Sequence, residues 1–274
     1  MPGDLLKLGG RIALVTGAGA HGGIGSAIAV GLARQGAHVA IADTDDEGAE
    51  TTASQIASLG CRSLAVHCDI SNPEEVTSMF CEVDRNLGCL DILVNVPYAF
   101  PSRVHPHELT LEDWNRTLAV SLTGYFLCSK EALSRMVANG KKGCILNIGS
   151  IAGSSAMGRG NFPYSCAKGG VAQMTKELAI EYAGHGIRVN AILPAQVMTP
   201  GFKKQLKDNP AVAEKMVPRL LAGLPIGRIL DPEDIVGPAL FLCGEASRAV
   251  TGVLLPVDGG NLAMNAGGSL TWND

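Results

Sequence analysis

The stretch VTGAGAHGGIG, residues 15–25, decides the fold of this chain, because it is a glycine-rich turn that follows an apolar run. Read literally, it contains G-x-G-x-x-G at Gly17, Gly19 and Gly22, a pattern that follows a first strand and opens a helix. It also contains a wider pattern, in which five residues separate Gly17 from the triplet Gly-Ile-Gly at 23–25. The two registers begin the helix at different residues.

Helix energetics favour the wider register. If the helix opened near Gly19, its first turns would contain Gly22, Gly23 and Gly25, each at a cost of about 1 kcal/mol relative to alanine. A helix that begins at Ile24 leaves the glycines in a loop, where positive φ angles and a close approach to a pyrophosphate are useful. The wider register therefore predicts a phosphate-binding loop, although a plain strand-to-helix turn remains an alternative at this point.

Short β-rich runs alternate along the chain with segments that have helical apolar spacing. Nearly continuous apolar strands separated by amphipathic helices predict a parallel sheet covered on both faces, an α/β fold. Seven strands are expected, at residues 11–17, 38–43, 63–68, 90–96, 143–150, 187–193 and 252–258. The length of 274 residues, with no repeat or low-complexity linker, favours a single domain over residues 1–274.

Charge and hydropathy bear on the partners of the protein. The net charge is -4 and the basic residues are scattered, so we expect no nucleic acid and no anionic membrane as partner. No apolar run approaches the roughly 20 residues of a membrane span, and the N-terminus lacks a signal-peptide pattern. The 8 cysteines show neither C-x-x-C nor zinc spacing, so we expect no metal site. These features predict a cytoplasmic protein that acts on a small molecule.

The second expected strand ends in Asp43, eighteen residues after Gly25. A carboxylate at this position can accept hydrogen bonds from both ribose hydroxyls of an adenosine, and it repels a 2′-phosphate. Neither loop residues 18–22 nor Thr44 supplies an arginine or lysine that would offset this repulsion. The sequence therefore favours NAD over NADP as cofactor. The alternative is that Asp43 serves only the turn that follows the strand.

The segment PYSCAK, residues 163–168, starts a second constellation. Tyr164 and Lys168 are four apart, so on a helix they share a face. An ammonium ~4 Å from a phenol at an effective dielectric of ~20 is worth ~4 kcal/mol, which would lower a phenol pKa of ~10 by about three units. Ser150 ends an apolar strand, at the edge of a parallel sheet where ligands bind. Taken alone, the spacing also fits a surface cation beside an aromatic ring.

Together these motifs resemble those of the short-chain dehydrogenase/reductase family. The resemblance covers about residues 8–260, and it leaves a tail at 261–274. It is carried by Ser150, Tyr164 and Lys168 and by the segments TGAGAHGGIG (16–25), CDI (68–70), DILVN (91–95), RVNAILP (188–194), PIGRILDPEDI (225–235) and VDGG (257–260). It implies a Rossmann-type doubly wound sheet with strand order 3-2-1-4-5-6-7. It also implies NAD-dependent hydride transfer that interconverts a secondary alcohol and a ketone.

The resemblance also implies a role for each site residue. Tyr164 is the acid/base, Lys168 lowers its pKa and binds the nicotinamide ribose, and Ser150 holds the substrate oxygen. Asp69 recognises the adenine of the cofactor. The implied cofactor-binding residues are Gly17, Gly23, Ile24, Gly25, Asp43, Asp69, Ile70, Asn95, Tyr164, Lys168, Val197 and Thr199.

Three departures from the family pattern affect the site. The first two glycines are separated by five residues rather than three, as in some enoyl reductases, but the spacing of Tyr164 and Lys168 argues for alcohol/carbonyl chemistry. The usual Asn-Asn-Ala-Gly reads NVPY, so Tyr98 either shifts the backbone or lines the substrate mouth. The Asn that usually completes a catalytic proton relay to the lysine is Ser121, which we expect one more water to bridge. An NAD-binding homologue with little turnover, a sensor or structural partner, is therefore the alternative function.

The substrate itself is not identified by the sequence. Apolar walls are expected around it, from Tyr98, Phe100, Met157, Phe162, Met198 and residues 201–224. Arg103 and Arg159 either bind a carboxylate or belong to the solvated surface.

Family members are usually homotetramers, and the resemblance implies interfaces on helices at about 110–138 and 162–183 and on the last strand. In the tail, Met264, Leu270 and Trp272 either pack against a neighbouring subunit or belong to a disordered end.

Overall fold

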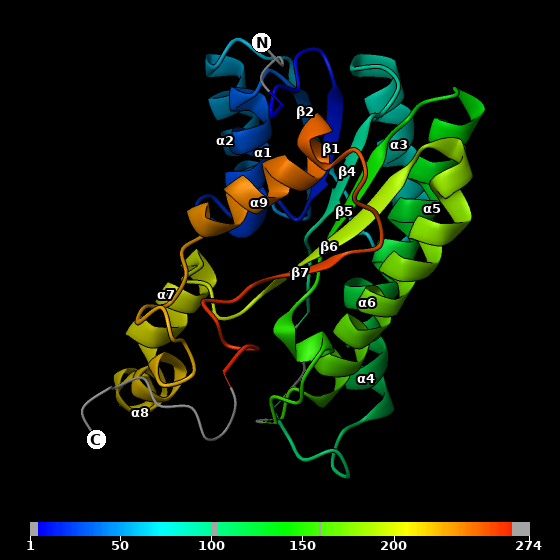
Figure 1. Cartoon of the computed structure of the whole chain (residues 1–274). Helices are drawn as coiled ribbons and strands as arrows, with labels where there is room; N and C mark the ends of the chain where they lie inside the picture. The colour runs from blue at the N-terminus through cyan, green and yellow to red at the C-terminus, as the bar shows by residue number, and fades with distance from the viewer. Residues whose placement is uncertain (1–4, 100–102, 159, 265–274) are drawn as a thin grey trace.

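A computed structural model describes residues 5–99, 103–158 and 160–264 of the chain. Its strands form one parallel sheet in the order β3-β2-β1-β4-β5-β6-β7, which confirms the expected fold class (Figure 1). The strands are β1 (Ile12–Thr16), β2 (His38–Asp43), β3 (Ser63–His67), β4 (Ile92–Asn95), β5 (Cys144–Ile148), β6 (Arg188–Pro194) and β7 (Leu254–Val257). Each lies within two residues of its expected position.

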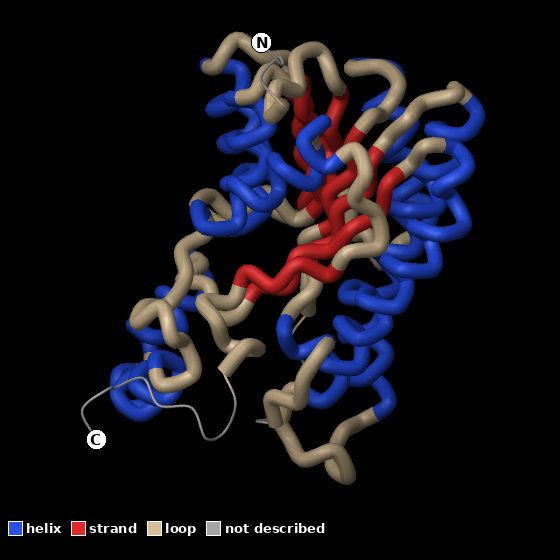
Figure 2. The backbone as a smooth tube through the Cα atoms, in the orientation of Figure 1, coloured by secondary structure: helices blue, strands red, loops and turns tan. Residues whose placement is uncertain are grey.

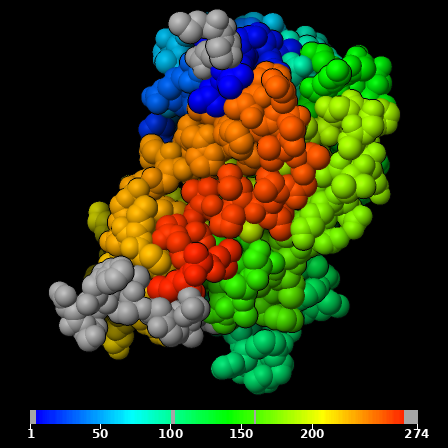
Figure 3. Space-filling view, viewed as in Figure 1, coloured from blue at the N-terminus to red at the C-terminus, as the bar shows by residue number. Residues whose placement is uncertain are grey.

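Helices cover both faces of the sheet, as Figure 2 shows. The helices are α1 (Ile24–Arg34), α2 (Asp46–Ser58), α3 (Pro73–Asn86), α4 (Leu111–Leu118), α5 (Gly124–Ala138), α6 (Phe162–Tyr182), α7 (Pro200–Asp208), α8 (Pro210–Leu221) and α9 (Glu233–Cys243). Side chains alternate along β1, because successive residues of a strand point to opposite faces. Ala13 and Val15 pack with α1, α2 and α9, whereas Leu14 packs with α3, α5 and α6. In Figure 3 the orange α9 and the red C-terminal strand region cover the front of the molecule.

The glycine-rich loop has the wider of the two predicted registers. Helix α1 begins at Ile24, with Gly23 as an extended N-cap. Gly17 and Gly22 have φ angles of 71° and 73°, a region that side chains disfavour. A Cβ atom on Gly25 would overlap the carbonyl oxygen of Gly17, so only glycine fits where the loop folds back on the helix. The prediction of a helix start at Ile24 is confirmed.

The helix expected at about 110–138 is interrupted. A π-helical turn at Ala119–Thr123 separates α4 from α5 and contains the buried Ser121. Such turns are frequent at functional sites. Within the described residues, no helix combines the length and the apolar character needed to cross a membrane.

Candidate active site

A cavity of about 1320 Å³ lies at the carboxyl ends of the strands, where ligands bind in sheets of this kind. Its walls come from the glycine-rich loop, the ends of β2 to β6, the start of α6, and helices α7 and α8. Most of the predicted site residues line it: Gly17, Gly23, Ile24, Gly25, Asp43, Asp69, Ile70, Ser150, Tyr164, Lys168, Val197 and Thr199. Residues from the whole length of the chain therefore meet at one site.

The carboxylate of Asp43 is fixed by backbone amides. One oxygen accepts from the Gly19 amide at 2.7 Å, and the other accepts from the Asp45 amide at 3.1 Å. A Cβ atom on Gly19 would lie 2.7 Å from the Asp43 carboxyl carbon, so this loop glycine lets the carboxylate approach. The carboxylate oxygens retain further lone pairs that can accept from a ligand hydroxyl.

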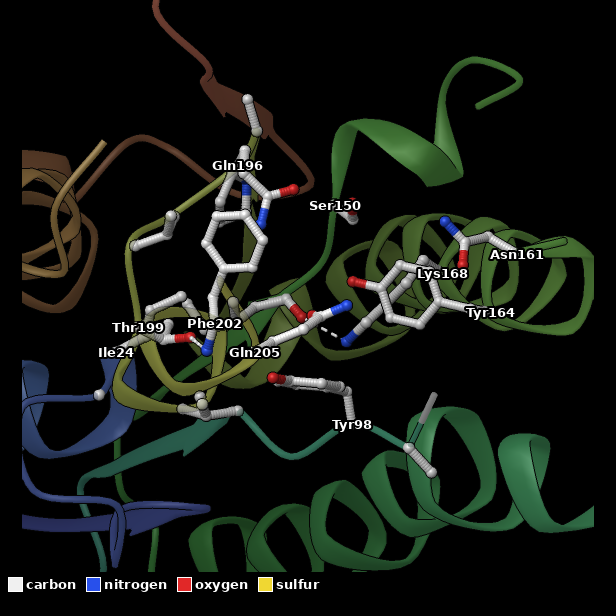
Figure 4. A pocket seen from close by; sticks show the side chains of 18 of the residues that line it. Ile24, Tyr98, Ser150, Asn161, Tyr164, Lys168, Gln196, Thr199, Phe202 and Gln205 are labelled. Carbon is white, nitrogen blue, oxygen red and sulfur yellow. Dashed lines mark hydrogen bonds between the residues drawn. The ribbon is translucent and has the colours of Figure 1, made fainter. Parts of the chain in front are cut away.

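Ser150, Tyr164 and Lys168 lie together on the wall formed by the end of β5 and the start of α6 (Figure 4). Ser150 follows β5, and its side chain caps a short helical turn by accepting from the Ala152 amide at 3.1 Å. Tyr164 and Lys168 share one face of α6, and the Lys168 Nζ atom is 5.9 Å from the centre of the Tyr164 ring. Ser150 and Tyr164 are hydrogen-bonded to each other. The predicted three-residue set is thus assembled in space.

Lys168 is buried and makes two hydrogen bonds. Its ammonium donates to the Tyr125 hydroxyl at 3.0 Å and to the Ile148 carbonyl at 2.7 Å. The Tyr125 hydroxyl donates in turn to the same carbonyl at 3.0 Å. The sequence analysis missed Tyr125; the available signal was its position four residues after Ser121, since residues at this spacing share a helix face.

Burial dominates the pKa values of the central pair. Desolvation lowers the pKa of Lys168 to about 7, because a charged ammonium is costly in an apolar surrounding. Desolvation also raises the pKa of Tyr164 to about 12, and the hydrogen bond from Ser150 offsets only part of this rise. The expected lowering of the Tyr164 pKa is therefore wrong for this arrangement. That expectation counted the attraction between the phenolate and the Lys168 ammonium but omitted the cost of burying the phenolate.

Two predicted site residues lie behind the cavity wall instead of lining it. The Asn95 amide donates to the Asn147 side chain at 2.9 Å, inside the sheet. The Ser121 hydroxyl accepts from the Ala99 amide at 3.0 Å, so it holds the loop that follows β4. The cofactor contact of Asn95 and the relay role of Ser121 stay predictions.

Tyr98 lines the cavity, which agrees with one of the two alternatives predicted from the sequence. Its ring meets the Tyr164 ring edge-on, with centres 6.3 Å apart and planes at 80°. In Figure 4 the Gln205 side chain of α7 points toward this pair, whereas the Phe202 ring lies beside Gln196. Tyr98 therefore forms part of the substrate wall.

The other expected walls are confirmed only in part. Met157 lines the cavity, but Phe162 packs beside Trp114 in a separate surface hollow, and Met198 is not among the described lining residues. Phe100, Arg159, Leu270 and Trp272 lie outside the described residues.

Asn161 was not singled out from the sequence. It is 8% exposed, it lines the cavity at the start of α6, and its side-chain oxygen has no hydrogen-bond partner in the described structure. A buried unpaired acceptor is costly unless a ligand or water satisfies it. Among the described residues, no cluster of three or more His, Cys, Asp or Glu side chains could hold a metal ion.

The chain matches known proteins over nearly its whole length. A family model described as enoyl-(acyl carrier protein) reductase covers residues 17–261. The chain is 40% identical over 256 residues to cis-4-hydroxycyclohexanecarboxylate dehydrogenase of Sinomonas cyclohexanicum. The matched region covers 93% of this chain and 97% of that protein.

Solved structures give the same result. A short-chain type dehydrogenase/reductase from Mycobacterium marinum is 30% identical, with a TM-score of 0.85 over 95% of this chain and 98% of that one. A gluconate 5-dehydrogenase from Burkholderia cenocepacia, in complex with NADP and tartrate, is 32% identical, with a TM-score of 0.86 over 96% of this chain and 99% of that one. The sheet order, the Ser150, Tyr164 and Lys168 cluster and these relatives agree. The chain therefore belongs to the short-chain dehydrogenase/reductase family and is an oxidoreductase that interconverts an alcohol and a carbonyl.

Proposed function

We propose that the protein is an NAD-dependent dehydrogenase that oxidises a secondary alcohol to a ketone, or reduces the ketone in the reverse direction. The observation that carries this proposal is the cluster of Ser150, Tyr164 and Lys168 at the carboxyl ends of the strands. Because Tyr164 and Lys168 are one helical turn apart, the cluster supports chemistry at a CH–OH group rather than at a C=C bond.

The loop residues fit a dinucleotide. Gly17 and Gly22 adopt positive φ angles, Gly25 leaves no room for a Cβ atom, and the start of α1, which has no side-chain cap, lines the cavity. We assign the phosphates to this loop, the adenosine to Asp43 and Asp69, and the nicotinamide ribose to Tyr164 and Lys168. When bound, the nicotinamide supplies or accepts the hydride.

The side chains of the protein handle the proton. Ser150 donates a hydrogen bond to the substrate oxygen and orients it, and Tyr164 removes the hydroxyl proton during oxidation. The Lys168 ammonium stabilises the phenolate form of Tyr164, which accepts this proton and becomes the neutral phenol. Tyr125 and the Ile148 carbonyl hold that ammonium in place through the bonds of 3.0 Å and 2.7 Å.

The preference for NAD rests on charge at the adenosine end. The lining contributed by the glycine-rich loop, Asp43–Thr44 and residues 68–70 contains two carboxylates and no lysine or arginine. A 2′-phosphate beside Asp43 would be repelled without compensation. The relative from Burkholderia cenocepacia binds NADP, so the cofactor preference of this chain must be measured.

Titration of both cofactors tests this preference. We expect NAD to bind more tightly than NADP, and Asp43→Ala to narrow the difference by removing the repulsion. Glu47→Ala is the matched control, because this exposed residue of α2 does not line the cavity. Equal affinities in the unmodified protein would overturn the assignment to NAD.

Turnover separates the proposed enzyme from a cofactor-binding homologue with little activity. NADH formation should be followed with a panel of secondary alcohols that includes cis-4-hydroxycyclohexanecarboxylate, the substrate named for a relative. Turnover of at least one alcohol, abolished in Tyr164→Phe, is the expected result. Tight NAD binding without turnover on any member of the panel would favour a sensor or structural role.

We also propose a homotetramer, supported by apolar side chains on the outer faces of α5 and α6. Phe126 is 50% exposed and Ile180 is 76% exposed, and they belong to the two helices on which the family resemblance implies an interface. Sedimentation of Ile180→Asp tests this: a smaller assembly is expected, and an unchanged one places the interface elsewhere.

A further inference from the structure

The charged residues that line the cavity differ in sign according to the elements that contribute them: the carboxylates lie at the end of β2 and after β3, and two of the cations belong to α8. The two carboxylates that line it, Asp43 and Asp69, lie at the end assigned to adenosine. Apart from these two carboxylates and Lys168, the charged side chains of the described lining are Arg103, Lys215 and Arg219, and all three are positive. The part of the cavity left for the substrate is therefore cationic.

Two of these cations belong to one face of α8. Val212, Lys215, Met216 and Arg219 all line the cavity, at the three- and four-residue spacing of a single helix face. The acidic residue of this helix, Glu214, is not part of the lining. The face that α8 presents to the cavity thus combines apolar side chains with two positive charges.

These cations have no ion-pair partner in the described part of the chain. Arg135 and Arg228, by contrast, each contact two acidic side chains, and Arg11 contacts Glu245. Like charges four residues apart destabilise a helix, so Lys215 and Arg219 repel each other where they stand. An anion placed between them would remove this repulsion and gain charge-assisted hydrogen bonds.

We propose that the substrate carries a carboxylate, which Lys215 and Arg219 bind at the end of the cavity remote from adenosine. This inference rests on the proposed function, because it places the CH–OH group of the same molecule at Ser150 and Tyr164. The apolar body between the two groups contacts Val212 and Met216. Arg103, which lines the same cavity, adds a third positive charge whose field favours the same anion.

Direct binding tests the charge preference without turnover. Calorimetric titration of the NAD-loaded protein should compare cyclohexanecarboxylate with cyclohexanecarboxamide, which are alike in shape and differ in charge. We expect the carboxylate to bind about tenfold more tightly, as for charged hydrogen bonds at a partly exposed site. The preference should weaken with added salt, since the two cations remain in contact with solvent.

Substitutions assign the preference to α8. Lys215→Met and Arg219→Met should each reduce the ratio of the two affinities, and the double variant should bring it near one. Lys207→Met is the control, because this cation belongs to α7 but does not line the cavity. It should leave the ratio unchanged.

Several results would overturn the inference. Equal affinities for the two probes, binding of neither, or the same ratio in all variants would show that the cations are solvated surface. A loss of NAD affinity in Lys215→Met with an unchanged ratio would assign the cation to the cofactor. If the carboxylate preference holds but no secondary alcohol is turned over, the proposed function fails and the recognition of a carboxylate stands.

Discussion

Replacing Lys168 by methionine should stabilise the protein while it abolishes turnover. Lys168 is 1% exposed, and burial lowers the pKa of its ammonium from 10.5 to about 7. Methionine fills a similar volume without a charge. The polar groups that Lys168 leaves behind remain satisfied, because the Tyr125 hydroxyl still donates to the Ile148 carbonyl. The substitution therefore removes a buried charge and leaves no unpaired group.

The magnitude follows from the shift in pKa. A shift from 10.5 to about 7 corresponds, at 1.36 kcal/mol per unit, to a cost of about 5 kcal/mol for holding the lysine protonated in the folded state. This figure is an upper bound, since buried sites respond with an effective dielectric near ~20, and we expect about 2–4 kcal/mol. Between pH 7 and 10.5 the unfolded chain binds more protons at this residue, so the stability of the unmodified protein rises with pH.

Urea unfolding at several pH values tests this reasoning. The advantage of Lys168→Met over the unmodified protein should be largest at or below about pH 7 and should shrink toward about pH 10. Lys176→Met, at an exposed position of the same helix, should show no such dependence on pH. An advantage that does not change with pH, or a loss of stability near neutrality, would refute the argument that burial of the ammonium is costly.

Three further substitutions test the loop and the proton path. Tyr164→Phe should abolish turnover and leave NAD affinity nearly unchanged, because it removes one oxygen and little volume; substantial dehydrogenase activity would assign the acid/base step to another group. Ser121→Asn should keep or modestly raise turnover, since an amide oxygen can also accept from the Ala99 amide and one additional bridging water costs little; a collapse of activity with normal folding would end the relay interpretation. Gly25→Ala should weaken NAD binding by at least about tenfold, because its Cβ would overlap the Gly17 carbonyl. Gly237→Ala, which meets nothing within 4 Å inside α9, should not weaken it; comparable losses in both variants would contradict the steric argument.

The sequence by itself determined the features that depend on local conformation. Glycines are poor in a first helical turn and useful at positive φ, so the wider register of the loop and the helix start at Ile24 could be predicted from energetics alone. The four-residue spacing of Tyr164 and Lys168 likewise placed both on one face of α6. The strand order came from the family resemblance, because apolar patterns specify strands without specifying their neighbours.

Tertiary structure alone decided the features that depend on burial and on contacts between distant segments. The pKa of Tyr164 is raised rather than lowered, because the cost of desolvation depends on how completely the packed elements exclude water. The partners of Lys168, Tyr125 and Ile148, come from α5 and β5 and reach it only when these elements pack against α6. Phe162 was expected in the substrate wall but packs against Trp114 instead. Lys215 and Arg219 of α8 could be related to the site only from the fold, which places them in the lining of the same cavity as Tyr164. Periodicity and backbone preference act over a few residues, whereas the dielectric and charge around a side chain are set by every segment that packs near it.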